Sequence, residues 1–389
     1  MRLNEDQKAA LIKFRKWYKD YNKPTKCTRS WFEISGAAGT GKTTLAKYLF
    51  ESVGISDKEV LFVAYVGKAT SALAKNGLKA KTIHSAIYQL IWETTIDPVT
   101  EERVSKMNFV KKEALPPWVK GIVVDEGSMV PEQIALDLLS FDIPVIVLGD
   151  LNQLPPVMGR PVFLQQPDAI LNQIMRQNEE SPIIRLSQDI LHGNSFGTGN
   201  YDENGLIKVV ADKYGLVADF KEYDAVIVGK NITRDMYNKY IREQVYHRTG
   251  SLRVGDKIIC RKNNWSYCNH DGMPLTNGLV GYVVDIDEER STRAYTLIEF
   301  KPEGFSNSFN DIYLDRMAFE TPVSNNKKFT GFNNFDKFEY AYAITCHLAQ
   351  GSQYNNVYIK YERMGTRDYC KRWLYTAVTR AVERITLVI

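Results

Sequence analysis

The sequence predicts an α/β fold with two domains built on parallel sheets, one interrupted by a small hairpin and the other by a β-rich segment. In both halves of the chain, short apolar runs alternate with segments of helical character, as in parallel strands joined by crossover helices. Residues 88–117 break this alternation with polar, proline-containing sequence, and residues 251–335 hold short strands between Gly and Asn turns. We therefore expect a first α/β domain (1–87 and 118–170), a hairpin insert (88–117), a second α/β domain (171–250 and 336–389) and a β-rich insert (251–335).

Composition sets few limits on function. The chain has 389 residues and a formal net charge of +4, which is small for this length, so any nucleic-acid groove must be a local feature. Its 5 cysteines are scattered without a CxxC pair, which favours free thiols in a reducing compartment over disulfides or a zinc site. The first residues do not resemble a signal peptide and no apolar run is long enough to span a membrane, so we expect a cytoplasmic protein.

The first predicted element is a helix over residues 4–22. Asn4 is a suitable cap, and Glu5 and Asp6 place negative charge in the first turn, where it suits the helix dipole. Apolar side chains recur at helical spacing, with lysines and arginines between them, at Leu11, Phe14, Trp17, Tyr18 and Tyr21. Basic residues interleaved with aromatic ones can bind nucleic acid, but we favour an amphipathic helix that packs its aromatics inward and leaves a basic face in solvent.

A phosphate-binding stretch follows the strand predicted at residues 31–34. Gly36, Gly41, Lys42 and Thr43 fit the P-loop pattern G-x-x-x-x-G-K-[ST], and a helix follows. Glycines let main-chain N–H groups point at a phosphate, a lysine brings charge to the β- and γ-phosphates, and a hydroxyl can bind Mg²⁺. The strand–turn–helix context favours this interpretation over an ordinary glycine-rich turn. The residues predicted to bind the nucleotide are Gly36, Ala37, Ala38, Gly39, Thr40, Gly41, Lys42, Thr43 and Thr44.

A pair of carboxylates closes a later strand of the first domain. Residues 121–124 are apolar and are followed by Asp125 and Glu126. Downstream of a P-loop, such a pair is typical of a Walker B motif, in which Asp125 would hold Mg²⁺ through water and Glu126 would polarise the attacking water. The alternative is a solvated acidic turn. The other predicted strands are 59–65, 144–150, 224–229, 254–260, 281–286, 294–300 and 385–389, with a helix at 233–244.

With these two motifs and five further stretches, the chain resembles the superfamily 1B helicases of the RecD-like and phage Dda-like type over nearly its full length. Five stretches in the family's order carry the resemblance, at residues 3–7 (Q motif), 149–157 (motif III), 174–177 (motif IV), 342–353 (motif V) and 374–381 (motif VI). The motif III stretch, Gly-Asp-Leu-Asn-Gln-Leu-Pro-Pro-Val, is the most specific of them. The resemblance implies two RecA-like P-loop domains, 1A and 2A. The hairpin would be a strand-separating pin (1B), and the β-rich insert an SH3-like domain (2B).

The resemblance also implies roles for single residues. Gln7 would bind adenine, and Gln153 would sense the γ-phosphate. Arg176 and Arg380 would be arginine fingers, although a lone arginine on a helix is more often solvated or ion-paired. The implied nucleic-acid contacts are Lys68, Thr82, His84, Phe109, Thr345, His347 and Gln350. Phe109 stands about where the Dda-like pin offers an aromatic ring to a base, while an isolated phenylalanine is more often part of a core.

The implied function is an ATP-driven, Mg²⁺-dependent helicase that moves 5′→3′ on single-stranded DNA and separates duplex strands, in DNA replication, recombination or repair. The expected partners are single-stranded and forked duplex DNA, with single-strand-binding or replisome proteins as further candidates and no membrane. We expect a monomer, and the compact length would suit a phage helicase in the host cytoplasm. Three alternatives stay open: a DNA-stimulated ATPase that remodels nucleoprotein without unwinding, the motor subunit of a nuclease complex, and a small-molecule kinase that shares only the P-loop.

Overall fold

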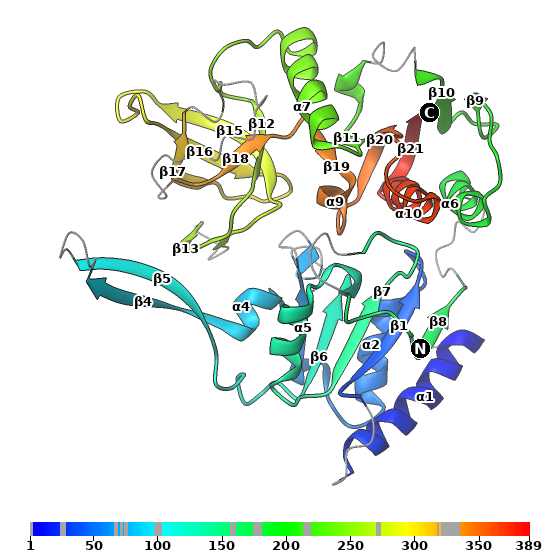
Figure 1. Cartoon of the computed structure of the whole chain (residues 1–389). Coiled ribbons are helices and arrows are strands. Elements are labelled where there is room, and N and C mark those ends of the chain that lie inside the picture. The colour runs from blue at the N-terminus through cyan, green and yellow to red at the C-terminus, as the bar shows by residue number, and fades with distance from the viewer. Residues whose placement is uncertain are drawn as a thin grey trace. The chain divides into compact units, whose positions relative to one another are not determined.

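The computed structural model describes residues 3–23, 29–65, 69–70, 73, 77–96, 103–155, 161–173, 181–212, 219–269, 274–316, 319 and 335–389. The chain forms two compact units, and each is described by itself. Unit 1 comprises Met1–Leu151 and Pro155–Glu179, and unit 2 comprises Asn152–Leu154 and Glu180–Ile389. Figure 1 labels many of their helices and strands. No helix in the described ranges combines the length and the apolar character that crossing a bilayer requires.

Unit 1 is built on a six-stranded parallel sheet with the strand order β3-β2-β6-β7-β1-β8. Its strands are β1 (Trp31–Gly36), β2 (Val60–Ala64), β3 (Ala80–Thr82), β6 (Gly121–Asp125), β7 (Val145–Gly149) and β8 (Ala169–Leu171). Its helices are α1 (Glu5–Tyr21), α2 (Lys42–Glu51), α4 (Ile83–Ile87) and α5 (Glu132–Leu139), with the 3₁₀ turns η1 (Asp57–Glu59) and η2 (Gly127–Met129). Because the strands run the same way, the P-loop after β1, Asp125 at the end of β6 and Gly149 at the end of β7 lie at one edge of the sheet.

Both faces of this sheet are buried, as its continuous apolar strands predict. Successive side chains of one strand enter different cores, so that Phe62 of β2 packs with α1 and α2, whereas Leu61 and Val63 pack with α4 and α5. On α1, Phe14 is fully buried and Trp17 nearly so. The predicted inward packing of the α1 aromatics is thereby confirmed.

The insert predicted at residues 88–117 contains an antiparallel hairpin, which extends away from the sheet of unit 1 (Figure 1). Strands β4 (Tyr88–Ile96) and β5 (Arg103–Lys111) pair along their full length. At the base of the hairpin, the Tyr88 hydroxyl donates a hydrogen bond to Asp137 on α5. Phe109 lies opposite Leu90 in the register of the hairpin. Its side chain is outside the described part of the structure, so the stacking role of Phe109 stays a prediction.

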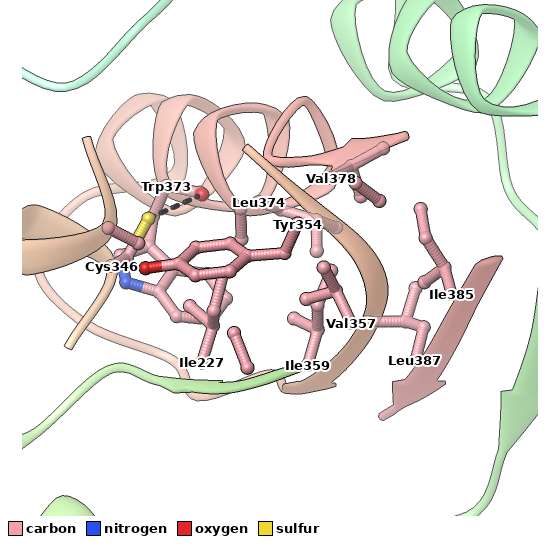
Figure 2. Packing of buried hydrophobic residues seen from close by; sticks show 14 of the residues in the cluster. Ile227, Cys346, Tyr354, Val357, Ile359, Trp373, Leu374, Val378, Ile385 and Leu387 are labelled. Carbon is pink, nitrogen blue, oxygen red and sulfur yellow. Dashed lines mark hydrogen bonds between the residues drawn. The ribbon is translucent and has the colours of Figure 1, made fainter. Parts of the chain in front are cut away.

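Unit 2 contains a second six-stranded sheet in the order β19-β11-β20-β21-β10-β9, parallel except for the edge pair β9–β10. Its strands are β9 (Gly199–Asn200), β10 (Ile207–Val210), β11 (Ala225–Val228), β19 (Ala343–Thr345), β20 (Tyr354–Lys360) and β21 (Ala381–Val388). Its helices are α6 (Pro182–His192), α7 (Asn231–Tyr240), α9 (Cys346–Ala349) and α10 (Arg367–Val378), with the 3₁₀ turn η4 (Phe220–Glu222) and the π-helical turn η5 (Ile241–Val245). In the core between α10 and the sheet, Trp373 packs with Val357 and Ile359, and the Cys346 thiol donates to the Trp373 carbonyl (Figure 2).

The β-rich insert of unit 2 is a five-stranded antiparallel sheet in the order β17-β16-β15-β12-β18. Its strands are β12 (Lys257–Cys260), β15 (Val280–Asp287), β16 (Tyr295–Pro302), β17 (Phe309–Asp315) and β18 (Phe338–Tyr340), and a separate pair is formed by β13 (Asn264–Cys268) and β14 (Pro274–Leu275). The sheet has a core of its own, in which Phe300 and Phe309 are fully buried. The insert is therefore a small domain within unit 2.

The fully buried Asp256 fixes this insert to the α/β part of unit 2. Its Oδ2 accepts hydrogen bonds from the Arg242 guanidinium at 2.9 and 3.1 Å and from the Arg253 main-chain N–H at 2.9 Å. Its Oδ1 accepts from Arg248 at 3.2 Å and from the Tyr342 hydroxyl at 2.7 Å. This carboxylate is thus bonded to residues before and after the insert in sequence.

The predicted fold class is confirmed, with two parallel-sheet α/β units, a hairpin and a β-rich insert. The predicted domain limits differ from the structure in two places. β8 runs to Leu171 and pairs with β1, so the first sheet passes the predicted boundary at residue 170, because a three-residue strand leaves too short a pattern to recognise. Asn152–Leu154, predicted in the first domain, belongs to unit 2. The remaining limits stay predictions.

Candidate nucleotide and nucleic-acid sites

The P-loop lies between β1 and α2, and its glycines are explained by backbone geometry. Gly39 and Gly41 have φ angles of 84° and 80°, a conformation that glycine adopts without strain. Gly36 has a different requirement, because a Cβ there would come within 2.7 Å of the Thr40 hydroxyl and 2.9 Å of the Leu171 carbonyl oxygen. The loop leads directly into the first turn of α2, whose free N–H groups favour an anion.

Lys42 and Thr40 donate hydrogen bonds to main-chain carbonyl oxygens within the P-loop. The Lys42 ammonium donates hydrogen bonds to the carbonyl oxygens of Gly36 and Ala37 at 2.7 and 2.9 Å. The buried Thr40 hydroxyl also donates to the Ala37 carbonyl, at 3.0 Å. Ala38 and Thr43 are half-buried, and Thr44 is exposed. The predicted nucleotide-binding residues therefore form one continuous loop and helix start.

Gln7 contacts this loop from α1. Its amide nitrogen donates to the Thr40 carbonyl oxygen at 3.4 Å, and its amide oxygen accepts from the Asn4 main-chain N–H at 3.2 Å. The side chain is fully buried. Both polar atoms of the amide thus have protein partners, and the role in adenine binding stays a prediction.

Asp125 and Glu126 lie at the same edge of the sheet as the P-loop. Burial and the neighbouring Glu126 carboxylate raise the pKa of Asp125 to about 6, while the positive charge of Lys42 opposes the rise. Glu126 has a φ of 51°, a strained conformation for a residue other than glycine. Its main-chain N–H donates to Asp125 Oδ1 at 3.0 Å. Its side-chain Oε2 is buried and has no hydrogen-bond partner among the described residues.

These residues fit a magnesium ion. The Thr43 hydroxyl and the Asp125 carboxylate are hard oxygen donors, and Mg²⁺ beside a nucleotide takes its remaining ligands from phosphates and water. Within the described ranges, no cluster of three or more His, Cys, Asp or Glu side chains could hold a metal by itself. The unpartnered oxygen of Glu126 and the raised pKa of Asp125 mark a position where a cation would offset buried negative charge.

The motif III stretch passes from unit 1 to unit 2. In unit 1, the Leu151 main-chain N–H donates to the hydroxyl of Ser35 on β1 at 3.1 Å. In unit 2, the Leu154 N–H donates to the Thr376 hydroxyl at 3.0 Å, and its carbonyl accepts from the Gln350 amide at 3.1 Å. Gln153 lies between these two anchors and is 5% exposed, with its side-chain oxygen unpartnered among the described residues.

Arg380 follows α10 and is 3% exposed. Its guanidinium donates to the carbonyl oxygens of Thr376 and Ser352 at 3.1 and 3.4 Å and to the Thr379 hydroxyl at 3.2 Å. In the described part of the chain no carboxylate forms an ion pair with it. A buried guanidinium held by neutral groups keeps its charge available for an anion, and the role of Arg380 as an arginine finger stays a prediction.

The predicted nucleic-acid contacts lie in both units. In unit 1, the Thr82 hydroxyl caps α4 by accepting the Ser85 N–H at 3.2 Å. The ring of His84 lies between those of Tyr65 and Tyr88, with centroids 5.8 Å from each, and burial lowers its pKa. His84 is therefore a neutral, half-buried ring at the foot of the hairpin.

In unit 2, Thr345 ends β19, and His347 and Gln350 follow it in motif V. Burial lowers the pKa of His347, whose Nε2 lies 3.4 Å from the Tyr369 hydroxyl. Gln350 is 3% exposed, and its amide nitrogen donates a hydrogen bond to the Leu154 carbonyl oxygen. Its contact is with the motif III segment, so a direct contact with nucleic acid stays a prediction.

Two predicted residues, Lys68 and Arg176, lie outside the described residues. Three others were missed from the sequence. Thr376 and Ser35 anchor the motif III segment, and Tyr65 packs against His84. Thr376 lies within motif VI and could have been found there, whereas Ser35 and Tyr65 are recognised only from their contacts in the folded chain.

A P-loop, a paired carboxylate and a second parallel-sheet unit with a buried arginine define the class of P-loop proteins with two RecA-like units. Residues 21–212 match a family model described as an AAA domain, and residues 340–388 one described as a UvrD-like helicase C-terminal domain. Over 379 residues the chain is 26% identical to the ATP-dependent RecD2 DNA helicase of Deinococcus radiodurans, covering 90% of this chain and 46% of that protein. Over 295 residues it is 26% identical to the ATP-dependent DNA helicase dda of Enterobacteria phage T4, covering 67% and 64%. The chain is thus similar to the superfamily 1B helicases of the RecD-like and Dda-like type.

Solved structures agree in fold. The crystal structure of Bacteroides Pif1 bound to ssDNA matches with a TM-score of 0.53 at 19% identity, covering 100% of this chain and 92% of that chain. Pif1 from Bacteroides in complex with ADP-AlF3 and ssDNA matches with a TM-score of 0.51 at 19% identity. The chain spans about half the length of the RecD2 relative and under two thirds of the phage relative.

Proposed function

We propose that the protein is an ATP- and Mg²⁺-dependent DNA helicase that translocates 5′→3′ on single-stranded DNA and separates duplex strands. Lys42 would contact the β- and γ-phosphates, and Thr43 and Asp125 would hold Mg²⁺, which neutralises phosphate charge when bound. Glu126 would orient the attacking water and accept its proton. Arg380 would stabilise the charge that develops on the transferred phosphoryl group.

The observation that carries the proposal is the double anchoring of the motif III segment. One end is bonded to Ser35 on the strand that leads into the P-loop, and the other to Gln350 of motif V and Thr376 of motif VI. A change in the position of the P-loop strand would therefore pass through Asn152 and Gln153, the two residues between the anchors, to the elements around Arg380. This is the kind of connection that a motor needs between hydrolysis and the movement of a second domain.

The nucleic-acid part of the proposal is supported by the relatives. Two curated proteins with which the chain aligns are ATP-dependent DNA helicases by name, and the Pif1 structures of the same fold contain ssDNA. The 5′→3′ direction follows the superfamily. We further infer that the protein works as a monomer in the cytoplasm, meeting single-strand-binding or replisome proteins there. Cys260, Cys346 and Cys370 are not in disulfides, which suits a reducing compartment.

The test is an unwinding assay on two duplexes, one with only a 5′ single-stranded tail and one with only a 3′ tail. We expect ATP-dependent opening of the 5′-tailed duplex alone. Lys42→Ala removes the phosphate contact and is the inactive control, and Lys47→Ala, on the same helix, is the matched control that should leave opening unchanged.

Three other results of this assay would point to a different function or direction. Opening of the 3′-tailed duplex alone would keep the motor and contradict the direction. ATP turnover that single-stranded DNA stimulates without opening either duplex would favour a protein that remodels nucleoprotein. Turnover that DNA does not change would contradict the proposal altogether.

A further inference from the structure

Unit 2 contains a hollow of about 410 Å³ between its α/β part and its β-rich insert. One wall comes from residues in or next to η4, η5 and β20, and the other from β12, β15 and the residue after β16. Hollows of this size bind small molecules or parts of larger ones. The proposed motor mechanism makes no use of it.

The hollow lies at the edge of the six-stranded sheet of unit 2 where β11 and β20 begin. The predicted DNA contact Thr345 lies at the opposite edge, where β19 ends. Asp224 immediately precedes β11 and Tyr354 begins β20, and both line the hollow. Thr345 ends β19, where it pairs in parallel register with Val228, the last residue of β11. The four residues of β11 separate the two edges by about 13 Å. A ligand in the hollow therefore occupies a second site.

Two exposed tyrosines give the hollow its aromatic character. Tyr246, after η5, is 38% exposed, and Tyr282, on β15, is 41% exposed. Each has a lysine ammonium 5.8 Å from its ring centre, Lys221 for Tyr246 and Lys257 for Tyr282. Flat rings beside cations are the combination on which nucleobases stack while a phosphate is neutralised.

The two carboxylates of the hollow balance its two lysines in formal charge, but each carboxylate already has a hydrogen-bond partner. Glu303 pairs with Lys257 at 2.8 Å, and Asp224 accepts the Asn356 main-chain N–H at 2.9 Å. Among the described residues, no carboxylate pairs with Lys221. An exposed lysine without a carboxylate partner, beside an aromatic ring, favours an anionic ligand.

The walls are also fixed before any ligand binds. Tyr342 lies in the hollow with its ring centroid 5.2 Å from that of Tyr246, and its hydroxyl is bonded to the buried Asp256 at 2.7 Å. Asp256 adjoins Gly255, which lines the same hollow. A site that is ordered in advance loses little conformational entropy on binding.

We propose that this hollow binds one nucleotide unit, with its base stacked on Tyr246 or Tyr282 and its phosphate at Lys221. The unit is a free mononucleotide or one residue of a single strand, and both offer the same base and phosphate. The hollow contains none of the residues to which the motor proposal gives a role, although Tyr342 and Gln353 of its lining lie within the motif V stretch.

The experiment is photo-crosslinking of the full chain, followed by peptide mapping. Two probes distinguish the sources of the ligand: free 5-iodo-dUMP, and an oligothymidylate that carries a single 5-iodouracil. Adducts on Tyr246 or Tyr282 with the free probe identify a mononucleotide site. Adducts there with the oligonucleotide alone identify a strand segment.

Affinity measured by fluorescence anisotropy decides the case independently of crosslinking yield. Tyr246→Ala and Tyr282→Ala should each weaken binding of the probe that gave the adduct by about 5- to 150-fold, the range for loss of one base–aromatic stack. If neither probe gives an adduct, both probes are measured and the same loss is expected. Tyr246→Phe and Tyr282→Phe keep the ring and should restore binding. Tyr313→Ala is the matched control, because Tyr313 is also 41% exposed on the insert but lies outside the hollow.

Affinities of Tyr246→Ala and Tyr282→Ala equal to that of Tyr313→Ala would overturn the proposal. Adducts confined to residues outside the hollow would do the same. Unwinding by the wild-type chain is scored separately, so a failure of this site and a failure of the motor function are distinguishable.

Discussion

Two aspartates, the half-buried Asp125 of unit 1 and the fully buried Asp256 of unit 2, have opposite surroundings. Asp256 in unit 2 is bonded to two arginines, a tyrosine hydroxyl and a main-chain N–H. Asp125 in unit 1 accepts one main-chain N–H and lies beside a second carboxylate, and its pKa is raised to about 6. The first arrangement satisfies every oxygen and fixes a structure. The second leaves negative charge that Lys42 compensates only in part, which costs stability and prepares the site for a cation.

The largest effect is expected from removing the satisfied carboxylate. Asp256→Ala leaves Arg242, whose side chain is 5% exposed, without its partner, and an unpaired buried charge costs about 3–5 kcal/mol. The free energy of unfolding, measured by urea denaturation, should fall by that amount. The matched control is Asp368→Ala, which breaks the exposed pair of Asp368 with Arg372 and should cost less than about 1 kcal/mol. Equal losses in the two variants would contradict the structural role of Asp256.

Replacing Asp125, the carboxylate with few partners, should change the free energy of unfolding in the opposite direction. Asp125 binds its proton more firmly in the folded state, so the free energy of unfolding falls as pH rises from about 4 to about 6 and stays lowered above that window. Asp125→Asn removes this cost and should raise the free energy of unfolding at pH 7.5 by at most about 3 kcal/mol. The gain should disappear toward pH 4, where the wild-type carboxyl is also neutral.

The same variant should lose activity. Without the carboxylate, Mg²⁺-dependent ATP turnover should fall by about 10- to 100-fold or more. Glu132→Gln makes the same change of charge at an exposed position on α5 and should alter neither stability nor turnover appreciably. If Asp125→Asn is less stable than wild type at pH 7.5, the carboxylate is satisfied after all and the comparison fails.

Of these two aspartates, only Asp125 could be predicted from the sequence. The apolar run before Asp125 predicts both the strand and the position of the carboxylate at its end, because strand and motif are local in sequence. Asp256 carries no such signal, since Arg242 and Tyr342 become its partners only through the fold. The same holds for Leu154, whose partner Thr376 is more than two hundred residues away in the chain.

The titration of Asp125 can be followed directly. The carboxyl carbon resonance of Asp125, assigned by its absence in Asp125→Asn, should titrate near pH 6 in the wild-type protein. Lys42 lowers this pKa by its charge, so Lys42→Ala should move the midpoint to higher pH. A midpoint near the ordinary value of 3.8 would show that the site is better solvated than its burial indicates.

The smallest effect is expected at Gln7, a buried polar group that is satisfied although it contacts the P-loop. Gln7→Ala removes half of the capping box of α1 and the bond to the Thr40 carbonyl, which should lower the free energy of unfolding by about 1 kcal/mol. Because both amide atoms serve the protein, kcat/KM should fall in parallel for ATP and GTP. Gln133→Ala, which removes an exposed amide bond to Asp137, is the control for both measurements. A selective loss of kcat/KM for ATP would show that the Gln7 amide exchanges its bonds within the protein for bonds to adenine. Gln7 would then be a functional residue on α1 and not only a structural one.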